Sequence, residues 1–150
     1  MGVAIISPMR RGVTLLELVI TIALLGVLVS FAVPPARAVR DRLAVDDDAH
    51  ALADAHARAR LTAVAERRVM ILTLTPDSLV LRAVESSTDT VERWRGVLTG
   101  YGVLRTGLPR QVVFAPSGAT MGFANATYTL SRGAATKQVV VSRYGRVRII

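Results

Sequence analysis

The sequence predicts an α+β protein in which a long N-terminal helix, transmembrane in its first part, packs on a C-terminal antiparallel β-sheet head. Three observations predict this class. An apolar run occupies residues 13–33, an Ala- and Arg-rich helical pattern continues to about residue 68, and β-type runs separated by turn signals follow from Val69. The chain therefore divides into residues 1–12, 13–34, 35–68 and 69–150.

The first predicted element is a membrane-spanning helix. Between Val13 and Val33 the only polar residues are Thr14, Glu17, Thr21 and Ser30. Such a helix is about 30 Å long, which matches the hydrocarbon core of a bilayer. Arg10 and Arg11 precede it, so the amino terminus is expected to stay in the cytoplasm while the rest of the chain crosses.

Two features interrupt this apolar pattern. Glu17 is a carboxylate inside a membrane-length segment, where burial of a charge costs about 2.5–3.5 kcal/mol at a helix centre. Its presence therefore predicts a function and a partner for the charge. Pro34 and Pro35 follow the apolar run and predict a break or bend in the helix.

A conventional signal peptide and a plain membrane anchor are the competing interpretations. Ala36-Arg37-Ala38 fits a small-x-small cleavage pattern. Both interpretations leave Glu17 unexplained, and the proline pair would lie before the cut. We therefore expect neither.

The helix is expected to continue to about Arg68 as an amphipathic segment. Its predicted apolar stripe comprises Val39, Leu43, Leu52, Ala55, Ala59 and Val64. This stripe should pack on a sheet.

Short β-type runs follow the helix. Pro76-Asp77 is the first turn signal between them, and residues 114–118 are expected to form a further turn. Trp94 is expected to pack on the sheet, and residues 101–107 to be irregular. The predicted strands are 69–75, 78–84, 91–98, 111–115, 126–131, 138–142 and 146–150.

Composition limits the chemistry. The chain has no cysteine, which excludes disulfides, thiolate metal sites and cysteine nucleophiles. No Ser-His-Asp order or phosphate-binding glycine loop is visible, so no catalytic residue and no cofactor are expected, and the protein is predicted not to be an enzyme. The net charge of +8 favours acidic partners, although it also serves solubility.

A second polar cluster has a metal-like composition. It contains Asp46, Asp47, Asp48, His50, Asp54 and His56. Oxygen and imidazole ligands need a convergent pocket, whereas a helix with many arginines nearby favours a solvated face. We expect no metal site.

The junction Arg10-Arg11-Gly12-Val13-Thr14-Leu15-Leu16-Glu17 resembles the leader junction of type IV prepilins and type II secretion pseudopilins. This resemblance implies that a prepilin peptidase cuts between Gly12 and Val13 and methylates Val13. It implies that Glu17 pairs with the terminal amine of a neighbouring subunit during filament assembly, and that Pro34 kinks the helix. Val13 departs from the phenylalanine that is usual at the first mature position.

Later motifs narrow the resemblance to the minor pseudopilin H and minor pilin FimT family. They are residues 59–64, Trp94, the 114–118 turn and the ending at residues 140–148. The resemblance implies a structural subunit of a type II secretion pseudopilus or type IV pilus. Its expected partners are other pilins, the prepilin peptidase, the inner-membrane assembly platform and membrane lipid. The protein would be anchored once in the bacterial inner membrane, with its head in the periplasm. The cysteine pair of many FimT-like heads is missing.

The alternative function is that of a FimT-like minor pilin that binds extracellular DNA for uptake in natural transformation, and it depends on the basic C-terminal segment. On a strand, Arg146 and Arg148 share one face about 6.6 Å apart, a spacing that suits consecutive phosphates. Lys137 and Arg143 would extend the patch, and the Gly-Arg-x-Arg pattern resembles a DNA-binding motif of FimT-like minor pilins. The competing interpretation is an edge strand whose charges prevent aggregation.

Overall fold

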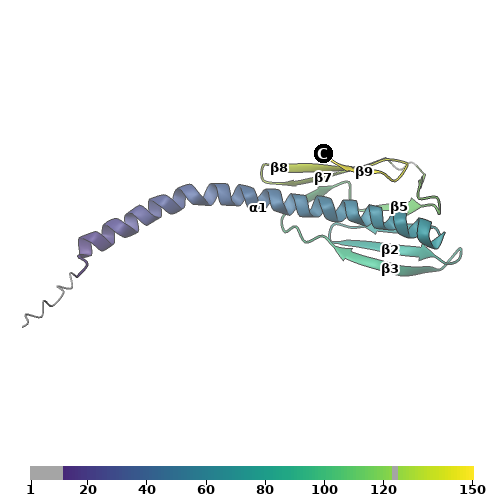
Figure 1. Cartoon of the computed structure of the whole chain (residues 1–150), viewed down its shortest axis with the longest axis horizontal. Helices are drawn as coiled ribbons and strands as arrows, with labels where there is room; N and C mark the ends of the chain where they lie inside the picture. The colour runs from purple at the N-terminus through teal and green to yellow at the C-terminus, as the bar shows by residue number, and fades with distance from the viewer. Residues whose placement is uncertain (1–11, 123–124) are drawn as a thin grey trace, which may run out of the picture. The chain divides into compact units, whose positions relative to one another are not determined.

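The computed structural model describes residues 12–122 and 125–150, without the side chains of residues 32–34. The chain forms two compact units, residues 1–37 and 38–150, which we describe separately. A single helix, α1 (Leu15–Glu66), contributes to both (Figure 1). It continues through Pro34-Pro35 without the interruption that the sequence suggested as one possibility.

The end of α1 is formed by an unusual residue. Arg67 adopts a positive φ of 51°, and the Arg68 amide donates to the Ala63 carbonyl at 3.3 Å. This is the six-to-one hydrogen bond of a Schellman cap, in which the left-handed position is usually a glycine. The expected helix end at about Arg68 is thus close to the observed one.

In the second unit, one face of α1 is sealed against the sheets. The buried residues recur at steps of three and four: Val45, Asp48, Ala49, Leu52, Ala55, His56, Ala59 and Ala63. Three members of the predicted stripe are wrong, because Val39, Leu43 and Val64 are 53%, 58% and 48% exposed. The stripe that is buried lies on a different side of the helix from the predicted one. It consists largely of alanines and includes Asp48 and His56, which hydropathy alone would not place in a core.

The first sheet has the antiparallel order β3-β2-β1-β5-β6. Central strand β1 alternates strictly, and its buried Leu72 lies opposite Leu81 on β2 and Val112 on β5. Trp94 on β3 packs against the core, with the Arg58 guanidinium 5.2 Å from its ring centroid. The strands are β1 (Met70–Leu74), β2 (Ser78–Val84), β3 (Thr90–Val97), β5 (Arg110–Phe114) and β6 (Thr120–Met121).

The second sheet has the antiparallel order β4-β7-β8-β9. Its strands are β4 (Leu104–Thr106), β7 (Ala126–Arg132), β8 (Ala135–Val141) and β9 (Val147–Ile149). Strand β4 corrects the prediction that residues 101–107 are irregular, and β6 was not predicted. Short strands of two or three residues carry almost no periodic signal, so their pairing partners define them.

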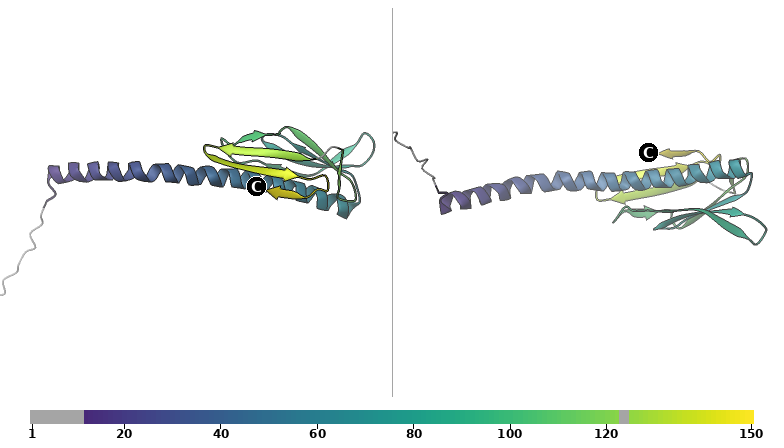
Figure 2. Two further views of the ribbon diagram at one scale, coloured as in Figure 1. Left: turned by 90° about the horizontal axis from the view of Figure 1, so that it is seen from above. Right: turned by 60° about the horizontal axis from the view of Figure 1, so that its bottom comes forward.

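Both sheets lie along the second part of α1 (Figure 2). Their buried residues form one core with those of the helix. His56 shows this arrangement, since its ring lies 6.4 Å from Phe114 on β5 and 5.5 Å from Tyr128 on β7, between centroids. The α+β class is as predicted. The division of the strands into two sheets was not.

The turn after Phe114 forms as expected. The Ala115 amide donates to the Ala119 carbonyl at 2.8 Å, and Gly118 has a φ of 79°. This hairpin joins β5 to β6 and lies against the helix beside Arg60.

Candidate functional site

The start of α1 has a defined cap. Gly12, Val13 and Thr14 are exposed and non-helical, and the helix begins at Leu15. The Glu17 amide donates to Thr14 Oγ1 at 3.2 Å, and the Leu18 amide donates to the Thr14 carbonyl at 3.1 Å. Thr14 is therefore the N-cap, and Glu17 stands at the third helical position, as in a capping box.

The sequence analysis missed this capping role of Thr14. The two threonines differ in the structure, because Thr21 Oγ1 donates to the Leu18 carbonyl inside the helix at 2.8 Å. The spacing Thr-x-x-Glu before an apolar run is the signal that could have identified the cap. Glu17 also benefits from the positive end of the helix dipole in this first turn.

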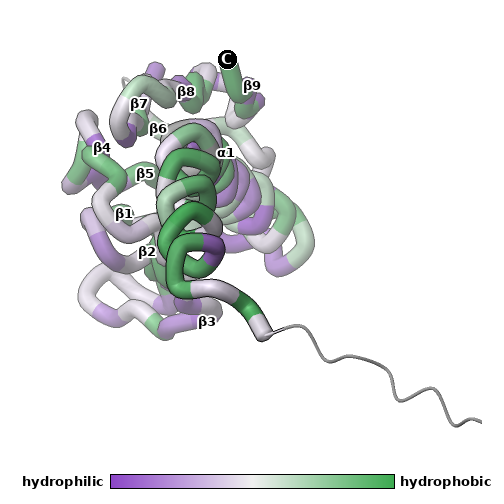
Figure 3. The backbone as a smooth tube through the Cα atoms, turned by 90° about the vertical axis from the view of Figure 1, so that its left-hand side faces the viewer, coloured by the Kyte–Doolittle hydropathy of each residue, from purple (hydrophilic) through white to green (hydrophobic). Residues whose placement is uncertain are grey.

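The surroundings of Glu17 are apolar and uncovered. Leu15, Leu16 and Leu18 are 80%, 69% and 54% exposed. The first part of α1 consists mainly of hydrophobic residues (Figure 3), and an 18-residue stretch of it that is long and apolar enough to cross a membrane is not buried at all within the molecule. Soluble proteins do not leave so large an apolar surface free, so this segment requires lipid or other apolar helices around it.

Some predicted features lie outside what the structure describes. Arg10, Arg11 and the rest of the leader precede the described residues, which begin at Gly12. The kink at Pro34 stays a prediction, since α1 is continuous there but the arrangement of the two units is not defined.

The metal-like cluster on α1 is dispersed. The solvated face predicted for it is wrong at Asp48 and His56, which are 1% and 0% exposed. His56 Nδ1 donates to the Leu52 carbonyl at 2.8 Å, and Asp48 binds Arg105. Among the residues that the structure describes, no three His, Cys, Asp or Glu side chains converge on a metal position.

The four predicted DNA-binding residues have different environments. Arg146 and Arg148 are exposed at β9. Arg143 donates to the Tyr144 hydroxyl at 2.8 Å, with its guanidinium 4.9 Å from that ring centroid. Lys137 pairs with Asp46 on α1, which lowers the pKa of that carboxyl. Lys137 is therefore engaged within the head.

Comparison with known proteins bears on both ends of the chain. Residues 7–33 match the prokaryotic N-terminal methylation motif, and residues 48–145 match the family described as type II transport protein GspH. The pilin-like protein PilA1 of Thermus thermophilus is 32% identical over 155 residues, covering 93% of this chain and 98% of that protein.

The fold has a solved counterpart. Two crystal structures of the type IV minor pilin FimU of Pseudomonas aeruginosa match with TM-scores of 0.61 and 0.57 at 15% and 16% identity. They cover 73% and 70% of this chain, and 90% and 91% of theirs. At this identity the likeness concerns the fold alone.

An apolar N-terminal helix that matches the N-terminal methylation motif and continues into a head of antiparallel sheets defines a membrane-anchored, pilin-like structural subunit. Within that class, the chain belongs to the GspH family of type II transport proteins. It is a minor pilin or pseudopilin, a structural subunit of a pilus or pseudopilus that assembles with other pilins or pseudopilins. The resemblance predicted from the sequence is thus confirmed. None of these comparisons supports the DNA-binding alternative.

Proposed function

We propose that a prepilin peptidase cleaves this chain after Gly12 and methylates Val13, and that Glu17 then guides the subunit into the filament. The observation that carries the proposal is the position of Glu17, which is three residues after a capping threonine and is surrounded by exposed apolar side chains. Cleavage would place a new ammonium at Val13, one residue before the cap.

The electrostatic argument rests on the scarcity of water around this segment. A carboxylate in lipid or in a bundle of apolar helices is costly unless a cation neutralises it. The Val13 ammonium of an adjacent subunit would supply that cation, and the need for contact would define the stagger between subunits. The capping-box spacing also allows Glu17 to approach its own amino terminus, which would keep the charge neutralised before assembly.

The proposed topology follows from the same segment. The amino terminus stays in the cytoplasm, the apolar part of α1 crosses the bacterial inner membrane, and the head lies in the periplasm. An assembly platform in that membrane would deliver the subunit to the growing filament. Pro34 would bend α1 where the apolar run ends.

Processing is tested by intact mass of the chain from membranes, with and without co-produced prepilin peptidase. Loss of residues 1–12 with gain of one methyl group supports the proposal. Gly12→Leu should stay uncut, because a bulky side chain would obstruct the protease at the scissile bond. An uncut wild-type chain, or a cut after Ala38, contradicts it.

Assembly is tested separately with Glu17→Gln, which preserves size and the capping amide but removes the charge. We expect this variant to be cleaved yet missing from purified filaments that contain the tagged wild type. Thr21→Val is the matched control, since it changes one polar residue of the same helix and should assemble normally. Normal incorporation of Glu17→Gln would show that the charge has no assembly role.

A further inference from the structure

A groove in the head lies between the exposed side of α1 and edge strand β9. On the helix it is lined by the apolar side chains of Ala53, Ala57 and Leu61 and by Asp54 and Arg60, and on the other side by residues 145–148. Its volume is about 590 Å³, and Leu61 is 69% exposed. We call it the α1–β9 groove.

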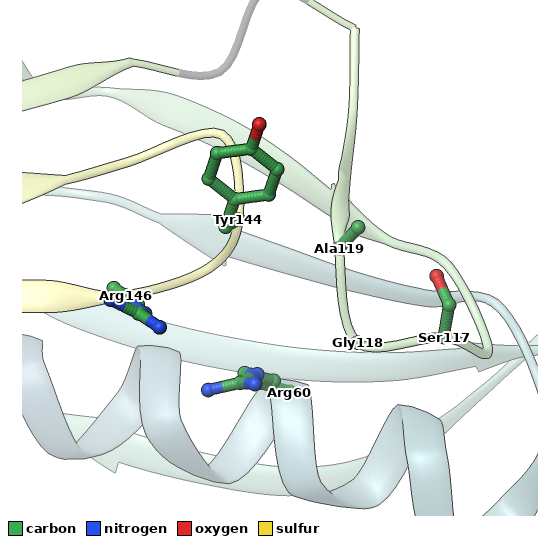
Figure 4. A pocket seen from close by; sticks show the side chains of 6 residues that line it. All are labelled: Arg60, Ser117, Gly118, Ala119, Tyr144 and Arg146. Atoms are coloured by element: carbon green, nitrogen blue, oxygen red, sulfur yellow. The ribbon is translucent and has the colours of Figure 1, made fainter.

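Positive charge gathers at one end of this groove. Arg60 and Arg146 also line an adjoining hollow of about 470 Å³ together with Ser117 and Tyr144 (Figure 4). Over residues 12–122 and 125–150, neither these two arginines nor Arg148 has an ion-pair partner. Five other arginines of the head are paired: Arg68, Arg93, Arg95, Arg105 and Arg132.

The position of Arg60 is defined by two glycine turns. A Cβ on Gly118 would lie 3.2 Å from Arg60 Cγ, and one on Gly145 would lie 3.2 Å from Arg60 Cδ and 2.8 Å from the Gly118 carbonyl oxygen. Both glycines have positive φ, 79° and 71°. The two turns therefore contact each other and the stem of Arg60, which positions this exposed cation beside the same hollow as Arg146.

Strand β9 has backbone groups on its outer edge that do not bond to β8. Gln138 and Ile150 exchange two hydrogen bonds of 2.8 Å, and the Ser142 amide donates to the Arg146 carbonyl at 2.9 Å. In an antiparallel pair, residues that hydrogen-bond to the neighbouring strand alternate with residues that do not. The amides and carbonyls of Val147 and Ile149 therefore point away from β8. Because β9 is the last strand of its sheet, this edge is open to an added strand.

The dimensions suit a short peptide. Residues 53–61 advance about 12 Å along the helix axis, the length of about four extended residues. Residues of an added strand that lie opposite Arg146 and Arg148 would be two apart in sequence and about 6.6 Å apart, and opposite charges in such cross-strand pairs are favourable.

We propose that the α1–β9 groove binds an extended segment of a partner protein that carries carboxylates at alternate positions, adding it as a strand to β9. Arg146 and Arg148 pair with these carboxylates, Arg60 strengthens the field at one end, and the alanine floor accepts the intervening apolar side chains. Free peptide groups and an apolar floor fit a polypeptide, whereas phosphates of a nucleic acid would use neither. This inference does not depend on cleavage after Gly12 or on the role of Glu17.

The test uses the full chain in detergent micelles and a fluorescein-labelled nonapeptide of alternating Val and Glu. A Val/Gln peptide controls for charge, and a single-stranded oligonucleotide of equal charge represents the nucleic acid. We expect the Glu peptide to bind and the Gln peptide to bind at least ten-fold more weakly. Arg146→Gln with Arg148→Gln should weaken binding at least ten-fold, whereas Arg42→Gln, about 16 Å before the groove along the helix, should leave it unchanged.

A second pair of variants tests the strand addition itself. Ile149→Pro removes the outward-pointing amide hydrogen of residue 149 without deleting a hydrogen bond to β8. Ile149→Ala also removes most of the isoleucine side chain but keeps that amide hydrogen. The proline variant should bind at least five-fold more weakly than the alanine variant. In the wild type, bound peptide should slow hydrogen exchange at the amides of Val147 and Ile149. Trp94 fluorescence during unfolding verifies that each variant has a folded head.

Three results would overturn the proposal. They are absence of binding at millimolar Glu peptide, equal affinity of Ile149→Pro and Ile149→Ala, and tighter binding of the oligonucleotide than of the Glu peptide. The last result would assign the same cations to a nucleic acid.

Discussion

Asp48 on α1 and Arg105 on β4 form an ion pair that is almost sealed from solvent. Their side chains are 1% and 10% exposed, with Arg105 Nη2 2.6 Å from Asp48 Oδ2. Asp48 Oδ1 also accepts the Gly100 amide at 3.0 Å, and Arg105 donates to the Gly100 carbonyl at 2.9 Å. A Cβ on Gly100 would lie 2.6 Å from Asp48 Oδ2, so only glycine fits. The pair ties the β3–β4 connection to the helix.

Asp48→Ala should destabilise the head by about 3–5 kcal/mol, because it leaves the Arg105 guanidinium buried without a counter-charge. The measurement is urea unfolding of the full chain in micelles, followed by fluorescence of the single tryptophan, Trp94. Asp48→Leu combined with Arg105→Met removes both charges and should cost markedly less. Equal losses in the single and double variants would show that the charge pairing itself contributes little.

His56 should make the head less stable as the pH is lowered. Burial lowers the pKa of His56 below its usual 6.5. Above pH 6.5 the imidazole is neutral in both states. As the pH falls below 6.5, the unfolded chain takes up the proton first and the folded state loses stability, until the folded pKa is also passed.

The pH effect is measured by comparing unfolding free energies between pH 7.5 and 5. His56→Gln should flatten the decline that the wild type shows in this range. His50→Gln is the control, because the side chain of His50 is 60% exposed and so has no burial to oppose its protonation. A decline that persists unchanged in His56→Gln would assign it to other groups.

Arg67→Gly should stabilise the head by about 0.5–1 kcal/mol. The residue occupies the left-handed position of the helix cap with a φ of 51°, where a side chain is strained by about 1–2 kcal/mol, partly offset by the greater freedom of glycine in the unfolded chain. Arg67→Ala is the matched control and should give no comparable gain. A gain with alanine equal to that with glycine would mean that charge, not backbone conformation, is responsible.

Thr14→Val should weaken the first turn of α1 by about 1 kcal/mol, because the Glu17 amide loses its capping oxygen. Hydrogen exchange at the Glu17 amide in micelles should then be roughly five-fold faster, and Thr14→Ser should exchange like the wild type. Thr21→Val tests specificity, since Thr21 bonds a carbonyl inside the helix and should not alter that amide. Unchanged exchange in Thr14→Val would contradict the capping role.

Local pattern was sufficient for much of this molecule. The continuous apolar run ending at Val33 predicted a membrane-length helix, and Pro76-Asp77 predicted the turn between β1 and β2, because each feature acts within a few residues of itself. The junction that contains Gly12, Val13 and Glu17 is likewise local, and its resemblance to a prepilin leader agrees with the match of residues 7–33 to the prokaryotic N-terminal methylation motif.

Tertiary structure decided what depends on partners distant in the chain. The sequence pattern predicts that Asp48 and His56 are solvated, but each has a distant partner that permits its burial. Asp48 binds Arg105, which is 57 residues away, and His56 contacts Tyr128, which is 72 residues away. Strands β4 and β6 are too short to show a period and exist through pairing with β7 and β5. The grouping of Arg60 with Arg146 likewise required two glycine turns to meet over the helix, since a lone arginine in a helical pattern carries no sign of its neighbour.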